Sequence, residues 1–246
     1  MLVDVHAHLD SKELLPDIKN IIKKCLEARM IAIINNGVDH TSNLKTIEIS
    51  DQYSIVKPSL GLFPTIAENL SEKEIDAELK FIEKLNPFAI GEVGLDFFRG
   101  KKKEKQIEIF KKIIKLAKKI KKPLIVHSRN AEKEVIKTLI EEKAKKVILH
   151  CFSGKKNLIH EAIKNNFYFS IPPNIVRNEH FKNLVKEAPI SLLLTETDCP
   201  YLGPEKEELN FPMNVIFSIK EIARIKHLDE EEVEKMIDMN FQRAFL

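Results

Sequence analysis

The stretch PLIVHSRNAEKEVIKTLIEEKAKKVILH, residues 123–150, sets two short apolar runs on either side of a longer, charged segment. The first run is PLIVH (123–127), the second is KVILH (146–150), and each ends in a histidine. Continuous apolar runs of this length are typical of strands in a parallel sheet that is buried on both faces. The stretch therefore predicts two parallel strands with a helix between them.

The same alternation recurs along the whole chain. Apolar residues recur with helical spacing between positions 18 and 26 and between positions 107 and 120. Ser71 with Glu74, and Asp229 with Glu232, have the spacing of capping boxes at helix starts. The predicted strands are residues 2–6, 31–35, 56–60, 88–92, 124–127, 147–150, 168–171 and 192–197.

Eight strand–helix units in 246 residues are the usual size of a (β/α)₈ TIM barrel. We therefore predict an α/β fold with a single barrel domain over residues 1–246. A doubly wound open sheet is the alternative, but it would place a glycine-rich phosphate loop after its first strand. The sequence has no such loop there.

The composition narrows the class of protein. Hydrophobic residues make up 43% and charged residues 31%, which predicts an ordered globular chain, and the net charge of +3 argues against coating nucleic acid by bulk charge. No signal peptide and no apolar run of about 20 residues is present, so we expect no membrane association. Three cysteines without a pairing pattern favour reduced thiols and a cytoplasmic location.

Histidines and carboxylates stand at the ends of the predicted strands. The end of the first predicted strand lies in VDVHAHLD (3–10). The alternation of side chains along a strand puts the two histidines of this motif, His6 and His8, on the same face as Asp4. Barrel enzymes build their active sites at this end of the strands, so the groups are expected to meet there. The candidate metal ligands are His6, His8, Glu92, His127, His150 and Asp198.

Imidazoles together with carboxylates suit Zn²⁺, Mn²⁺ or Fe²⁺, whereas Mg²⁺ prefers mostly oxygen ligands. Six candidates exceed the needs of one tetrahedral site. Two ions about 3.5–4 Å apart, bridged by a carboxylate such as Glu92, would use all of them. We therefore expect two divalent ions per chain, with zinc, manganese and magnesium as the candidates.

Other polar residues have simpler interpretations. Cys199 neighbours Asp198 and is expected to pack, because adjacent strand residues point to opposite faces. Glu196 shares the parity of Asp198, so we expect a buried pair, with Arg129 as a partner, and direct catalysis as the second interpretation. The lysine-rich segment 101–122 is interpreted as a solvated helix face. Structural or surface roles are expected for His40, His160, His180 and His227.

Five motifs, taken in order, resemble the TatD family of metal-dependent hydrolases. They are VDVHAHLD (3–10), GEVGLDFFR (91–99), PLIVHSRNA (123–131), ILHCFSG (148–154) and TETDCPYL (195–202), and the closing NFQRAFL (240–246) is also similar to that family's last helix. The resemblance covers essentially the whole chain. It implies an amidohydrolase-like barrel, a divalent metal centre and, as for several members, nuclease activity on DNA.

Carried over residue by residue, the resemblance assigns roles. His6 and His8 resemble the family's first-strand ligands, and Glu92 resembles its bridging carboxylate. His127 and His150 resemble the ligands of strands five and six. Asp198 resembles the last ligand, which also handles the proton of the attacking water, so Glu92 and Asp198 are the expected catalytic residues.

One position departs from the family pattern. The family typically reads Gly-x-His-Pro after the third strand, and this chain reads GLFP (61–64), with Phe63 in place of the histidine. Phenylalanine cannot donate a hydrogen bond or bind a metal. If that histidine contacts substrate, this protein is expected to turn DNA over more slowly or to prefer another substrate.

Two residues are candidates for contact with a phosphate. Arg129 shares the parity of His127 and has the geometry of a bidentate clamp, with an ion pair to Glu196 or Asp96 as the alternative. Ser153, in the turn with Gly154, offers a hydroxyl and backbone N–H groups. Lys155 and Lys156 follow and would either steer a polyanion or be ordinary surface lysines.

Three functions therefore remain open. The first is a metal-dependent phosphodiesterase or deoxyribonuclease that uses a metal-activated water, and it acts on DNA or another phosphodiester. The second is an amidohydrolase-type enzyme that cleaves a C–N or ester bond of a small molecule. Many such enzymes hold their metals with a modified lysine, and Glu92 at that strand favours the first function. The third is a nucleic-acid-binding barrel without catalysis, against which the complete ligand set argues.

Overall fold

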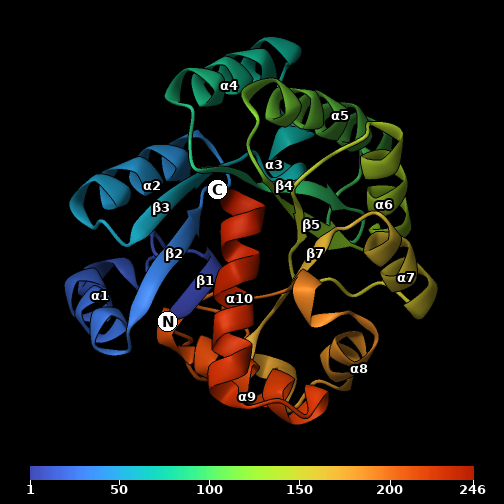
Figure 1. Ribbon diagram of the computed structural model, residues 1–246. Coiled ribbons are helices and arrows are strands. Elements are labelled where there is room, and N and C mark those ends of the chain that lie inside the picture. Colours follow the sequence, from blue (N-terminus) through green and yellow to red (C-terminus); the bar gives the residue numbers. More distant parts are fainter.

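A computed structural model describes residues 1–246 and shows a closed barrel of eight parallel strands inside a ring of helices (Figure 1). Each strand pairs with the next in chain order, as the sequence predicts. The strands are β1 (Leu2–Ala7), β2 (Met30–Asn36), β3 (Val56–Leu60), β4 (Ala89–Asp96), β5 (Leu124–Arg129), β6 (Val147–Leu149), β7 (Tyr168–Ile171) and β8 (Leu193–Thr195).

The helices alternate with the strands and bury an apolar stripe against them. Four short 3₁₀ turns complete the chain: η1 (Leu15–Asp17), η2 (Pro173–Val176), η3 (Ile190–Leu192) and η4 (Pro212–Asn214). The α-helices are α1 (Ile18–Glu27), α2 (His40–Gln52), α3 (Pro64–Ala67), α4 (Glu72–Leu85), α5 (Lys103–Ile120), α6 (Glu132–Glu141), α7 (Lys156–Lys164), α8 (Glu179–Glu187), α9 (Val215–Lys226) and α10 (Glu230–Phe245). None of them combines the length and apolar character that a membrane crossing requires.

The barrel closes between its first and last strands. Ala7 forms a parallel bridge with Cys199, and the His8 N–H donates to the Cys199 carbonyl at 2.9 Å. The Asp198 N–H donates to the His6 carbonyl at 2.8 Å. The closure excludes the open doubly wound sheet, and it holds the chain that follows β8 against the histidines that follow β1.

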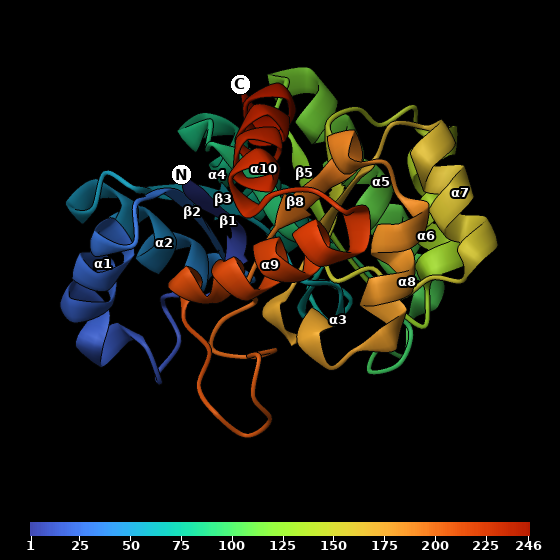
Figure 2. The same ribbon diagram turned by 60° about the horizontal axis from the view of Figure 1, so that its bottom comes forward.

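The two ends of the barrel are built differently. Both chain termini lie at the end where the strands begin, and α10 crosses that end, packed on β1, β8 and η3 (Figure 1). The loop between β8 and α9 projects from the other end, away from the termini (Figure 2). The strands finish at that second end, so it is the rim on which a barrel site forms.

Local signals explain several helix starts. Ser71 caps α4 with a complete capping box to Glu74, as predicted. Asp229 is the N-cap of α10, which confirms the predicted helix start, although its side chain makes no capping hydrogen bond. The segment 101–122 forms α5, whose apolar residues are buried while its lysines face outward, which confirms the solvated face.

Three predicted strand ends are wrong by two or more residues, and all lie beside the site: those of β4, of β5, which ends at Arg129 and not at residue 127, and of β8. β4 continues four residues beyond Glu92, because Gly94 and Asp96 pair with His127 and Arg129 of β5. β8 ends at Thr195, and the chain then turns so that Asp198 has a left-handed backbone with φ 55°. Asp198 therefore reaches the rim from a turn and not from a strand.

Candidate metal centre

The six candidate ligands come together at the rim of the barrel. His6 lies in β1 and His8 just beyond it, Glu92 in β4 and His127 in β5. His150 follows β6 directly, and Asp198 lies in the turn after β8. All are buried or half-buried, and their side-chain nitrogens and oxygens form neighbouring groups that could hold a metal ion.

Four of these donors surround one small volume. His6 Nε2 and His8 Nε2 are 3.1 Å apart. Glu92 Oε2 lies 3.5 Å from His6 Nε2 and 3.4 Å from His8 Nε2. Asp198 Oδ1 lies 3.6 Å from His6 Nε2 and 3.5 Å from His8 Nε2.

Five of the six separations among these four donors, all of them to His6 or His8, are close to the spacing of a tetrahedral metal site. Four donors that bind one ion at about 2.0–2.1 Å in a tetrahedron stand about 3.3 Å from one another. The measured donor separations, 3.1–3.6 Å, lie around that value. Two imidazole nitrogens that face each other with two carboxylate oxygens beside them therefore fit a divalent cation.

The other oxygen of Glu92 faces a second group of donors. Glu92 Oε1 lies 2.9 Å from His127 Nδ1 and 3.9 Å from His150 Nε2. The His6 and His150 rings are stacked with centroids 3.7 Å apart, so the two groups are contiguous. Glu92 thus stands between them with one oxygen toward each, which is the arrangement of a bridging carboxylate.

Burial and neighbouring charges shift the pKa values of the candidate ligands. Burial raises the pKa of Glu92, but hydrogen bonds from His127 and His6 outweigh it and hold that pKa well below its usual range. Asp198 behaves likewise through its hydrogen bond with His8. Burial lowers the pKa of His150, yet the adjacent Glu196 raises it to about 9. Burial and the neighbouring His150 lower the pKa of His6, so the imidazoles of the site differ in their protonation, and metal binding would require the neutral form of each ligating histidine.

Glu196 positions His150 and is fully buried. Its Oε2 accepts a hydrogen bond from His150 Nδ1 at 2.8 Å, and its Oε1 accepts from the Cys151 backbone N–H at 2.9 Å. Ser170 and the Cys151 thiol also donate to it. The buried pair expected for Glu196 is therefore made with His150. The sequence did not predict Cys151 and Ser170 as further partners of Glu196. Their only signal was position, since Cys151 lies in the motif ILHCFSG and Ser170 lies in a predicted strand.

Arg129 makes neither of the ion pairs considered as its alternative role. Its guanidinium lies over the Phe98 ring, 4.4 Å from the centroid. Glu196 cannot serve it because both carboxylate oxygens are occupied deeper in the barrel, and Asp96 accepts hydrogen bonds from the Phe98 and Arg99 N–H groups. The interpretation of Arg129 as an ion-pair partner of these acids is wrong, and a half-buried cation remains at the rim.

Asp4 fixes the turn that carries Asp198. It is fully buried and accepts hydrogen bonds from the His6 N–H at 3.1 Å and from the Thr197 N–H at 2.9 Å. The Thr197 hydroxyl also donates to it. The Asp4 side chain therefore ties β1 to the turn after β8, and Asp10 lies in the following loop, where it accepts from Asn35.

Phe63 lies beside the second group of donors. It is half-buried at the start of α3, and its ring centroid is 4.8 Å from that of His127. The His127 ring also has Nε2 3.4 Å from Asp96 Oδ2. An apolar ring thus covers one side of His127 where a histidine would present a polar group.

A cavity of about 570 Å³ opens at the same end of the barrel, beyond the ends of β4, β5 and β6, and none of the six candidate ligands lines it. Phe97, Asn130, Ser153 and Lys155 are among its lining residues. Ser153 donates to Glu132 at 2.9 Å, so its hydroxyl is already engaged, while Gly154 lines the same cavity. Lys156 lies outside the lining and pairs with Glu187, as an ordinary surface lysine does.

The residues for which structural or surface roles were predicted are not among the six candidate ligands and have other contacts. His40 contacts Glu78, His160 contacts Glu187, and His180 contacts the Phe152 carbonyl. His227 ends α9. Cys199 is fully buried and packs in the core, as expected.

Known proteins are similar to this chain in sequence and in fold. The family profile described as TatD related DNase matches residues 3–246. The chain is 34% identical to human deoxyribonuclease TATDN3 over 99% of this chain and 94% of that protein. It is also 34% identical to the uncharacterized metal-dependent hydrolase YabD of Bacillus subtilis, over 100% of this chain and 99% of that protein.

Among solved structures, YJJV, a TatD homolog from Escherichia coli K12, superposes with a TM-score of 0.91 at 22% identity and covers 99% of this chain and 97% of its own. A hydrolase TatD family protein from Entamoeba histolytica superposes with a TM-score of 0.89, also at 22% identity, over 100% of this chain and 98% of its own. These likenesses concern the fold, and the sequence match concerns the family. The chain belongs to the TatD-related DNase family.

Proposed function

We propose that this protein is a divalent-metal-dependent hydrolase that cleaves phosphodiester bonds in DNA. The observation that carries the proposal is the position of Glu92, whose two oxygens face two separate groups of donors. That arrangement supports two ions per chain, and the mixed nitrogen and oxygen donors favour zinc or manganese over magnesium. The proposed ligands are His6, His8, Glu92, His127, His150 and Asp198.

Bound divalent ions would supply Lewis acidity toward a phosphoryl oxygen and a nucleophilic water near neutral pH. The protein's own groups carry the remaining steps. Asp198 lies at the rim with one oxygen turned toward His6 and His8, and its low pKa keeps it ionised. It therefore accepts a proton from the attacking water and passes it to the leaving oxygen.

Other side chains orient the site and its substrate. Glu92 contacts both groups of donors and so keeps them beside each other. Glu196 fixes the orientation of the His150 ring through Nδ1. Arg129, free of carboxylate partners, is the proposed contact for a non-bridging phosphate oxygen. The backbone around Ser153 and Gly154, at the edge of the neighbouring cavity, is the proposed seat of an adjacent phosphate.

DNA as substrate is supported by the similarity to a human protein named a deoxyribonuclease and by a rim with a guanidinium that forms no ion pair. A carboxylate, Glu92, also stands where many C–N-cleaving amidohydrolases use a modified lysine. The three cysteines are free thiols, which supports the proposal of a reducing, cytoplasmic location.

The test is an assay of the metal-loaded protein on single-stranded DNA, double-stranded DNA and bis(p-nitrophenyl) phosphate. We expect cleavage with Mn²⁺ or Zn²⁺ that falls at least 100-fold in His127→Ala and in Asp198→Ala. The matched control is His160→Ala, which removes an exposed histidine far from the rim and should leave the rate unchanged. Cleavage that survives both site variants would refute the site. DNA binding without cleavage would refute the hydrolase.

A further inference from the structure

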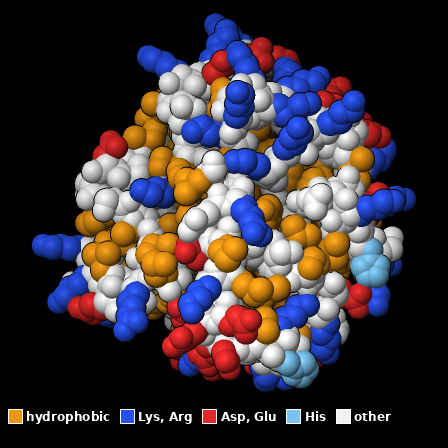
Figure 3. Space-filling model, in the orientation of Figure 1, with side chains coloured by type: hydrophobic (Ala, Val, Ile, Leu, Met, Phe, Trp, Pro, Cys, Tyr) orange, Lys and Arg blue, Asp and Glu red, His pale blue; other side chains and the backbone are white.

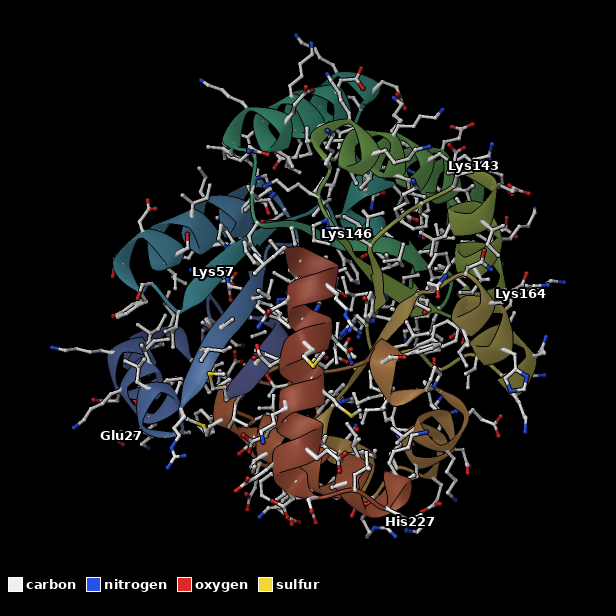
Figure 4. All side chains as sticks on the ribbon, in the orientation of Figure 1. Glu27, Lys57, Lys143, Lys146, Lys164 and His227 are labelled. Atoms are coloured by element: carbon white, nitrogen blue, oxygen red, sulfur yellow. The ribbon has the colours of Figure 1, made fainter.

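A second cavity of about 570 Å³ lies at the end of the barrel opposite the candidate metal centre. It opens where β5 begins and just before β6, beside the last turn of α5 and the C-terminal end of α10. Five lysines line it: Lys118, Lys121, Lys122, Lys145 and Lys146. Figure 4 shows Lys146 beside the end of α10.

The lysines come from two separate segments of the chain. Lys118, Lys121 and Lys122 stand at the end of α5, where lysines also complement the helix dipole. Lys145 and Lys146 lie in the connection between α6 and β6, so the dipole of a helix end does not account for their charge. The interaction with a helix dipole therefore explains only three of the five lysines that line this cavity.

No carboxylate neutralises these side chains. None of the five forms an ion pair within 4.0 Å, and the lining contains no Asp or Glu side chain. Only Lys118 has a partner, the Glu142 carbonyl at 2.7 Å. Neighbouring lysines behave differently, since Lys119 pairs with Glu83.

The floor of the cavity is apolar. Ala117 and Leu124 are buried beneath the lysines, and Leu246 forms an exposed apolar edge. The volume lies within the roughly 300–1,000 Å³ that small-ligand sites occupy. Figure 3 shows that this face of the molecule is basic over α4 and α5, whereas acidic side chains gather near the start of α10. A ligand for this cavity therefore combines an apolar body with negative charge.

We propose that this cavity binds a phosphate ester with an attached base and sugar, as part of a nucleic-acid strand or as a free nucleotide. The phosphate lies among Lys121, Lys145 and Lys146, and the apolar part of the ligand rests against Leu246 and the aliphatic stems of the lysines, above the buried Leu124 and Ala117. This site is separate from the catalytic proposal, because it lies at the other end of the barrel and contains none of the candidate ligands.

The experiment measures binding in EDTA, where no metal-dependent cleavage occurs. The probes are a fluorescein-labelled single-stranded 12-mer, dAMP and inorganic phosphate. The test variant is Lys121→Glu/Lys146→Glu. Its matched control is Lys164→Glu/Lys220→Glu, which makes the same change in net charge at exposed lysines that line neither cavity.

We expect the test variant to bind the 12-mer at least tenfold more weakly than the control at low salt. The slope of log affinity against log salt should fall by about 1.4, since each phosphate contact on a single strand contributes roughly 0.7. Loss of dAMP binding in parallel assigns the site to a nucleotide, and loss for the 12-mer alone assigns it to a strand. Both outcomes support the inference.

Equal affinity of test variant and control for every probe would overturn the inference, as would the absence of any binding by the wild type. Lys121→Gln/Lys146→Gln repeats the test without charge reversal, and a thermal melt of each variant confirms folding. Ligand protection of Lys121 and Lys146, but not of Lys164, from an amine-acetylating reagent gives an independent reading. Hydrolysis of bis(p-nitrophenyl) phosphate by the metal-loaded protein should be the same in all variants, so failure of the catalytic proposal registers separately.

Discussion

At the residue scale, Glu92 holds the candidate centre together. It is almost completely buried, and its oxygens face His6 and His8 on one side and His127 on the other. A buried carboxylate is stable only when its lone pairs are satisfied, and three imidazoles provide that here. The sequence identifies Glu92 as a candidate because it stands in a predicted strand. That its two oxygens face different groups of donors depends on side-chain rotamers, which a sequence pattern does not predict.

Glu196 tests the positioning of His150. In Glu196→Gln an amide group replaces one of the two acceptor oxygens, so either His150 Nδ1 or the Cys151 N–H loses its acceptor. We expect metal affinity and hydrolysis each to fall about 10–100-fold. The measurements are a Zn²⁺ titration and the hydrolysis rate, with Glu187→Gln on the surface as control. Unchanged metal affinity would mean that Glu196 does not position His150.

Phe63 tests the departure from the family pattern. Phe63→His restores the histidine of the family pattern and places a hydrogen-bond donor beside the ring of His127, whose centroid is 4.8 Å from that of Phe63. One added hydrogen bond to the transition state corresponds to about a tenfold rise in the rate of DNA cleavage. Phe63→Leu, which keeps the site apolar, is the control. A rate that stays level or falls in Phe63→His would show that this position does not face the substrate.

At the scale of elements, the extension of β4 brings Gly94 against β5. Its φ is 138°, a region open to glycine, and a Cβ there would lie 2.1 Å from the His127 carbonyl oxygen. Periodicity predicted where β4 begins, but it could not predict its end, because the last residues are held by pairing with β5. The same holds for β8, whose early end follows from the closure of the barrel.

Gly94→Ala should therefore displace β5 or block folding. We expect the free energy of unfolding to fall by more than about 3 kcal/mol, because backbone strain and a backbone clash act together. Urea denaturation measures the change. Gly203→Ala is the control, since a Cβ at that position meets atoms at an ordinary 3.5 Å. A Gly94→Ala protein as stable as the control would contradict the described register.

The connection between β4 and α5 depends on one carboxylate, Glu68. Although burial raises its pKa, hydrogen bonds from Gln106 and from the Lys101 and Lys102 N–H groups lower it below the ordinary value. A carboxylate with a lowered folded-state pKa stabilises the protein above its unfolded pKa, about 4.3, and loses that contribution as the pH falls through the folded-state pKa.

Glu68→Gln should therefore destabilise the protein at pH 7 and have a progressively smaller effect below pH 4. Loss of charge-assisted hydrogen bonds corresponds to about 1–2 kcal/mol at neutral pH. Thermal melts of both proteins across pH 3–7 measure the difference. A difference that grows toward low pH would have the wrong sign for this account.

At the scale of the whole molecule, the barrel separates two chemical environments. Metal-binding side chains meet where the strands end, and unpaired lysines gather where β5 and β6 begin. The regular alternation of apolar runs predicted the barrel. The end that carries the site was predicted because barrel enzymes build their active sites where the strands end. The basic cavity could not be predicted, because its lysines lie about 25 residues apart in the sequence and look like ordinary surface residues.

The central claim is that two divalent ions bind at the rim between β1, β4, β5, β6 and the turn after β8. Anomalous scattering from a crystal soaked in Mn²⁺ or Zn²⁺ tests it most directly. The account predicts two peaks that share Glu92, one beside His6, His8 and Asp198 and the other beside His127 and His150. A crystal without a peak within bonding distance of these residues would contradict it.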